Sequence, residues 1–124
     1  MNFNIKEAIE VLERTPQTLE LFLSGLSNGW LQYDEGEGTW NPLQVIDHLI
    51  EGEKTNWIPR LECILKEGEN QLLPPFDRFG HLKESSSCSI EVKFLEFKSL
   101  RNDNIMKLKN LVVYDQQLEM TGLH

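Results

Sequence analysis

Hydrophobic side chains repeat at helical spacing along most of this chain, and this periodicity is the feature that most restricts its fold. Apolar residues recur every three or four positions over about residues 5–27, 42–67 and 89–112, while no stretch alternates convincingly with period two. Each stretch opens with residues that favour the start of a helix, namely Asn4 with Glu7, Asn41 with Pro42, and Ser89. The sequence therefore predicts an all-α protein with three long helices.

Two prolines and one irregular stretch interrupt this pattern. Thr15-Pro16 is typical of a helix restart, so the first helical stretch is expected to be broken there. Pro59 is expected to kink the second stretch or to end its first half near Trp57, because proline lacks an N–H and crowds the preceding turn. Residues 69–88, which contain prolines, a glycine and a serine run, are predicted to be a long connection that either covers something or is mobile.

Composition limits the number of domains and the kinds of partner. A chain of 124 residues, 40% of them hydrophobic, can form one domain with a modest core, so residues 1–124 are interpreted as a single domain. The formal net charge of -8 disfavours binding to nucleic acid or to an anionic membrane surface. Neither a signal peptide nor an apolar run of membrane-spanning length is present in the sequence. We therefore expect a cytoplasmic protein without nucleic-acid or membrane partners.

Three amphipathic helices joined by long connections are typical of part of an antiparallel four-helix bundle. The sequence offers no fourth helix, so one apolar groove of the bundle would face water. At ~25 cal/mol per Å², a large uncovered apolar surface forgoes a free energy comparable to the stability of a small domain. A second copy of the chain is the simplest cover for this groove, and we therefore expect a homodimer.

His48 is the first candidate for chemistry. It lies early in the second predicted helix and points roughly away from the apolar stripe of that helix, beside the small residues Gly52 and Thr55. That position leaves room for a ligand or for water. Glu51 could share a metal with His48, although a catalytic zinc usually has three protein ligands. A solvated helix histidine is the alternative interpretation.

The other reactive side chains give weaker signals. His81 and His124 have no helical spacing to His48, and both are interpreted as surface histidines. Cys63 is expected to be a small buried hydrophobe, and Cys88 an exposed thiol with no histidine placed to activate it. The three tryptophans could line a pocket, but core packing is their commoner use. Residue patterns alone therefore assign no catalytic residue and no cofactor-binding motif.

The order and separation of several short segments carry a family resemblance. The segments are Arg14-Thr15-Pro16 with Leu19, residues 38–42, residues 45–53 with Trp57 and Arg60, residues 74–79, Phe94 with Phe97, and Leu100-Arg101 with Asn104. Together they span nearly the whole chain and resemble the DinB/YfiT-like family. This resemblance implies an antiparallel four-helix bundle that holds a divalent metal, zinc or nickel, on three histidines.

The resemblance assigns only one metal ligand to this chain. His48 matches the family's ligand on the second helix. The other two ligands come from an H-x-x-x-H pattern on the family's last helix, and this sequence contains no such pattern. The ending Gly122-Leu123-His124 resembles the turn that precedes that helix, which makes His124 a turn residue and not a ligand. We therefore expect a domain truncated before its fourth helix, with the metal absent or weakly bound.

The activities known in the family suggest one function and two alternatives for this chain. Relatives include metal-dependent enzymes that transfer groups to small-molecule thiols, so the resemblance implies a thiol S-transferase or a hydrolase. The missing ligands imply that this form is inactive. One alternative is a homodimer that assembles a metal site between chains, with His48 from each copy. The other is a helical interaction module whose groove binds a helix of another protein.

Overall fold

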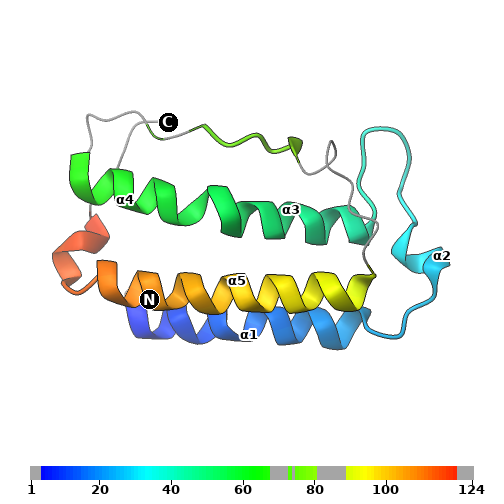
Figure 1. Ribbon diagram of the computed structural model, residues 1–124, viewed down its shortest axis with the longest axis horizontal. Helices are drawn as coiled ribbons and strands as arrows, with labels where there is room; N and C mark the ends of the chain where they lie inside the picture. Colours follow the sequence, from blue (N-terminus) through cyan, green and yellow to red (C-terminus); the bar gives the residue numbers. More distant parts are fainter. Residues whose placement is uncertain (1–3, 68–72, 74, 81–88, 120–124) are drawn as a thin grey trace.

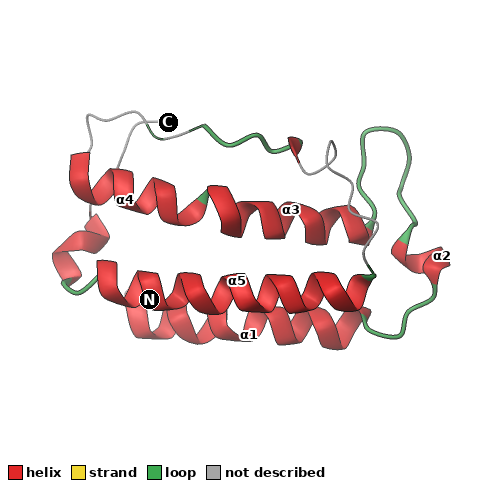
Figure 2. Cartoon of the chain, viewed as in Figure 1, coloured by secondary structure: helices red, strands yellow, loops and turns green. Residues whose placement is uncertain are grey.

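The computed structural model describes residues 4–67, 73, 75–80 and 89–119, and in these residues it contains helices and loops but no strand (Figure 2). This confirms the predicted all-α class. The helices, in chain order, are α1 (Ile5–Leu23), α2 (Asn28–Leu31), α3 (Pro42–Thr55), α4 (Trp57–Glu67), α5 (Ile90–Leu111) and the 3-10 helix η2 (Asp115–Glu119).

Side-chain caps start the three long helical stretches at the predicted residues. The side-chain oxygen of Asn4 accepts hydrogen bonds from the backbone N–H groups of the first turn of α1. Asn41 and Gln44 form a reciprocal capping box at the start of α3, with N···O distances of 2.8 and 2.9 Å. The Ser89 hydroxyl accepts from the N–H of Val92 at the start of α5. These caps satisfy N–H groups that have no partner within the helix.

Two expected helix breaks have different outcomes. The break expected at Thr15-Pro16 is wrong, because α1 runs through Pro16 without interruption. Thr15 does not cap a new helix; its hydroxyl donates to the carbonyl oxygen of Val11 one turn earlier. The break expected near Trp57 is confirmed, since α3 ends at Thr55 and α4 begins at Trp57. Asn56 lies between them, and Pro59 falls within the first turn of α4, where its missing N–H is tolerated.

Helix α5 is the central element of the fold. It packs along α1 on one side and along α3 on the other, with α4 extending α3 toward the far end (Figure 1). Phe97 of α5 is completely buried, and Ile46 of α3 is almost so. The main core cluster lies beside α3 and not beside α4. It consists of Leu23, Leu31, Ile46, Ile50, Ile90, Phe94 and Phe97.

A mostly apolar groove of about 460 Å³ lies between α1, the α3–α4 junction and α5. Leu12 of α1, Leu49 of α3, and Trp57 and Leu61 of α4 form its walls, and Leu108 of α5 adds to its floor. Trp57 is 59% exposed. Its indole nitrogen lies close to Gly52, where an added Cβ atom would approach it to 3.3 Å. The groove matches the expectation that one apolar face of the bundle is left uncovered by the residues that the structure describes.

None of the helices in the described residues is both long enough and apolar enough to cross a membrane.

Replacing Phe97 with Ala is expected to lower the free energy of unfolding by ~3–5 kcal/mol, because the substitution leaves a cavity in the core. Urea denaturation followed by circular dichroism measures this change. Leu95→Ala on the same helix is the matched control, since Leu95 is 69% exposed and should cost less than about 0.5 kcal/mol. Equal effects of the two substitutions would contradict the assigned core.

Candidate functional site

His48 lies under a layer of aromatic rings. Its imidazole centroid is 4.9 Å from the ring centroid of Trp40 and 5.7 Å from that of Phe76, while Phe79 packs edge-on against Trp40. The side chain is half-buried, and its Nδ1 atom is buried. The prediction that His48 points away from the core stripe agrees with this placement. The alternative of a solvated histidine is wrong, because residues 75–79 of the long connection fold back over α3.

A tight turn at residues 77–80 positions Phe79. The carboxylate of Asp77 accepts a hydrogen bond from the N–H of Phe79, and the carbonyl oxygen of Asp77 accepts from the N–H of Gly80. The guanidinium of Arg78 lies 5.3 Å from the centre of the Phe79 ring. An aspartate that bonds the backbone two residues ahead stabilises such a turn. The described part of the predicted long connection thus covers the face of α3 that carries His48.

The three tryptophans lie in two different environments, which the sequence does not distinguish. Trp40 packs against His48 with tilted rings and is half-buried, as a pocket residue would be. Trp30 on α2 and Trp57 on α4 are 65% and 59% exposed, so core packing is wrong for both. Hydrophobicity alone does not distinguish these cases, since a large exposed apolar residue is common on protein surfaces.

The residues around His48 do not fit a three-ligand metal site. Among residues 4–67, 73, 75–80 and 89–119, no group of three His, Cys, Asp or Glu side chains could hold a metal ion. Glu51 is the residue that could share a metal with His48. Its carbonyl and carboxylate oxygens accept hydrogen bonds from the Thr55 hydroxyl. Cys63 is a half-buried thiol on α4. His81, Cys88 and His124 lie outside the described residues.

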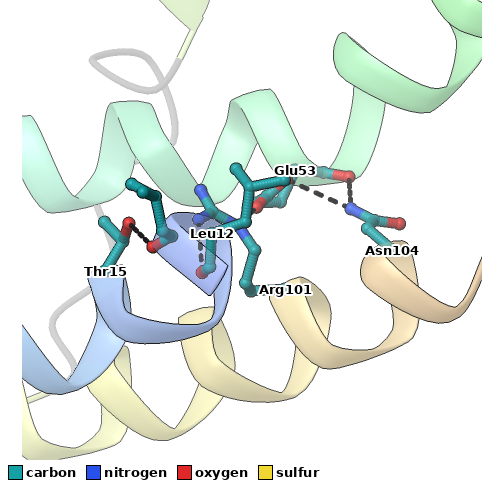
Figure 3. A network of polar contacts seen from close by, with 6 residues as sticks. Leu12, Thr15, Glu53, Arg101 and Asn104 are labelled. Carbon is teal, nitrogen blue, oxygen red and sulfur yellow. Dashed lines mark hydrogen bonds and ion pairs between the residues drawn. The ribbon is translucent and has the colours of Figure 1, made fainter. Parts of the chain in front are cut away.

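A polar network joins α1, α3 and α5 beside the groove (Figure 3). The guanidinium of Arg101 forms an ion pair with the Glu53 carboxylate, and the side-chain amide of Asn104 donates to the carbonyl and a carboxylate oxygen of Glu53. The side chains of Glu53 and Arg101 are only 3% and 11% exposed. Because buried charges are costly unless paired, these two groups depend on each other.

The same network explains how proline is tolerated inside α1. In an α-helix, the N–H of residue 16 would bond to the carbonyl oxygen of residue 12, but Pro16 has no N–H. The Nη1 atom of Arg101 donates to that carbonyl oxygen of Leu12 over 3.0 Å. Arg101 therefore replaces the missing backbone donor from a neighbouring helix.

Glu53, Arg101 and Asn104 lie in the segments that carry the family resemblance, but the sequence alone assigns them no role. Glu53 continues the buried positions Ile46 and Ile50 of α3, where a charged residue predicts a buried partner. Arg101 and Asn104 are three residues apart, so they share one face of α5. These two signals could have indicated a buried polar network. The bond to Leu12 could not be predicted, because it depends on how α1 and α5 align.

The comparisons with known proteins establish the family. The family model of the DinB superfamily matches residues 11–109, which contain every residue of the network and His48. The chain therefore belongs to the DinB superfamily. No curated protein matches it.

The fold resembles that of YfiT from Bacillus subtilis, which is described as a probable metal-dependent hydrolase with an unusual four-helix bundle topology. The two structures align with a TM-score of 0.77 at 23% sequence identity. The alignment covers 96% of this chain and 67% of YfiT. At this identity the likeness confirms the helical-bundle fold.

Arg101→Ala is expected to lower the free energy of unfolding by ~3–5 kcal/mol, because it leaves the Glu53 carboxylate buried without its cation. Lys54→Ala is the control, since Lys54 pairs with Glu96 at a site where both side chains are more than 40% exposed; it should cost less than about 1 kcal/mol. Chemical denaturation measures both, and similar losses would disprove the importance of the network.

A double-mutant cycle tests the role of Arg101 at Pro16. In a Pro16→Ala background the backbone N–H of residue 16 can bond to the carbonyl oxygen of Leu12. The cost of Arg101→Ala should then fall by about 1 kcal/mol, the usual net value of one hydrogen bond. Strict additivity of the two substitutions would show that Arg101 does not replace the missing donor.

Proposed function

We propose that this chain is a DinB-type domain related to metal-dependent hydrolases and thiol S-transferases, in which His48 is the one metal ligand supplied by the described residues. We further propose that the chain does not catalyse such a reaction by itself. The observation that carries this proposal is that the rings of Trp40 and Phe76 pack against His48, while the described part of the chain contains no group of three His, Cys, Asp or Glu side chains that could hold a metal ion. A catalytic zinc usually needs three protein ligands.

The family and the fold support the metal-dependent class. The chain is a member of the DinB superfamily, and YfiT, which shares its fold, is described as a probable metal-dependent hydrolase. The further details, which are zinc or nickel as the metal and a small-molecule thiol as the substrate, rest on the sequence resemblance. The described residues support no reaction step through a metal.

The purified chain is expected to retain well under one equivalent of zinc or nickel after dialysis, because one imidazole holds a divalent metal weakly. Elemental analysis by mass spectrometry measures the retained metal. His48→Ala should weaken any binding seen in a zinc titration, whereas Glu10→Ala, which removes an exposed carboxylate from α1, should leave it unchanged. Tightly held, stoichiometric metal would contradict the proposal of an inactive form.

A second candidate function is a homodimer in which a second copy covers the groove. The groove favours this because its walls are apolar and its main charged groups, Glu53 and Arg101, already neutralise each other. An identical acidic chain can therefore approach it without facing an unpaired charge. In such a dimer His48 from each copy could contribute to a shared site.

Sedimentation velocity at micromolar concentration is expected to show a dimer, because covering the groove removes apolar surface from water. Trp57→Glu should shift the equilibrium toward the monomer, since Trp57 lines the groove. Trp30→Glu makes the same chemical change at a residue of similar exposure that does not line the groove, and it should have no effect. A monomeric wild-type chain would disprove the dimer and leave the interaction-module alternative.

A further inference from the structure

The side chain of Asn56 is buried at the junction between α3 and α4 without a partner for its oxygen. Asn56 is only 7% exposed, and its Oδ1 atom accepts no hydrogen bond within the part of the chain that the structure describes. A buried polar atom without a partner costs free energy comparable to the gain from one or two hydrogen bonds. Native structures keep few such atoms, and each calls for a physical reason. The junction is therefore held in its arrangement against a local cost.

The side-chain amide of Asn104 holds the junction in this arrangement (Figure 3). In an uninterrupted α-helix, the carbonyl oxygen of Glu53 would accept from the N–H of residue 57, four positions later. Here α3 ends after the bond from the Asn56 N–H to the Gly52 carbonyl oxygen. The Glu53 carbonyl oxygen accepts from Nδ2 of Asn104 over 2.7 Å. A side chain of α5 thus occupies the acceptor that would join α3 to α4.

Helix α4 is joined to the rest of the bundle by few other restraints. Pro59 has no N–H to donate to the carbonyl oxygen of residue 55, so a second bond that would stiffen the joint is missing. Among residues 57–66, Ile58 alone is buried, whereas α3 has four buried residues. Segments with few buried apolar contacts open at a lower free energy than the rest of a domain. Helix α4 can therefore move as a unit while α3 and α5 stay packed.

From these observations we propose that α4 is a flap that swings about Asn56, with the Asn104 amide as the latch that holds it closed against α5. In the closed arrangement the latch is made and the Asn56 oxygen is buried. When the latch opens, water reaches Asn56 and removes the cost of burying its oxygen.

The swing of the flap changes the groove. Trp57 and Leu61 form one wall of the groove and are carried by α4, whereas Leu108 in its floor is carried by α5. Opening therefore moves the wall and leaves the floor in place. A molecule that contacts both the wall and the floor binds the closed arrangement better and shifts the population toward it. The flap involves neither His48 nor a metal, so it is independent of the proposed metal-dependent function.

Hydrogen exchange of the full chain, followed by mass spectrometry, tests the flap. Submicromolar protein keeps association of copies from covering the groove. The backbone amides of α4 are expected to exchange about tenfold or more faster than those of α3, because α4 opens without global unfolding. Equal protection of the two helices would overturn the proposal.

Two substitutions should change the exchange of α4 in opposite directions. Asn56→Leu replaces the buried amide with an apolar side chain of similar shape, so it favours the closed arrangement and should slow α4 exchange about tenfold. Asn104→Leu removes the latch and should speed α4 exchange about tenfold. Each α4 rate is divided by the α3 rate of the same variant, since a change in global stability affects both helices alike.

Asn102→Leu is the matched control, because it makes the same substitution on the exposed face of α5. It should leave the ratio of the α4 rate to the α3 rate unchanged. The latch would be refuted if Asn104→Leu left this ratio unchanged or lowered it. The cost assigned to the buried Asn56 oxygen would be refuted if Asn56→Leu left the ratio unchanged or raised it.

Discussion

One guanidinium group holds three helices of this fold in register. Arg101 pairs with Glu53 of α3 and donates to the carbonyl oxygen of Leu12 in α1, which has lost its usual partner to Pro16. A shifted helix would leave these buried charges unpaired, which is strongly destabilising. The alignment of α1, α3 and α5, and with it the shape of the groove, depends on this side chain.

Most of the helical framework could be predicted because its signals are local. The caps at Asn4, Asn41 and Ser89 and the break before Pro59 each depend on a few neighbouring residues. The expectation at Thr15-Pro16 was wrong for the opposite reason. A proline normally disrupts a helix interior, but here a residue 85 positions later in the sequence supplies the missing donor. Such a tertiary bond has no signature in the local pattern.

The candidate site was only partly accessible from the sequence. His48 and its direction on α3 follow from helical spacing, whereas its contact with Phe76 depends on the fold of a connection without periodicity. Asp47 and Lys93 are 46 positions apart in the sequence and lie on different helices, so spacing could not reveal their pairing. Each residue type was visible in advance, but its partner depended on how α3 packs against α5.

The interruption at Asn56 separates α3 from α4, which would otherwise form one continuous helix. His48 is carried by α3, while Trp57 and Leu61, which form one wall of the groove, are carried by α4. A change in the direction of α4 would reshape that wall and leave the imidazole in place. The groove and the histidine can therefore change independently as the sequence diverges.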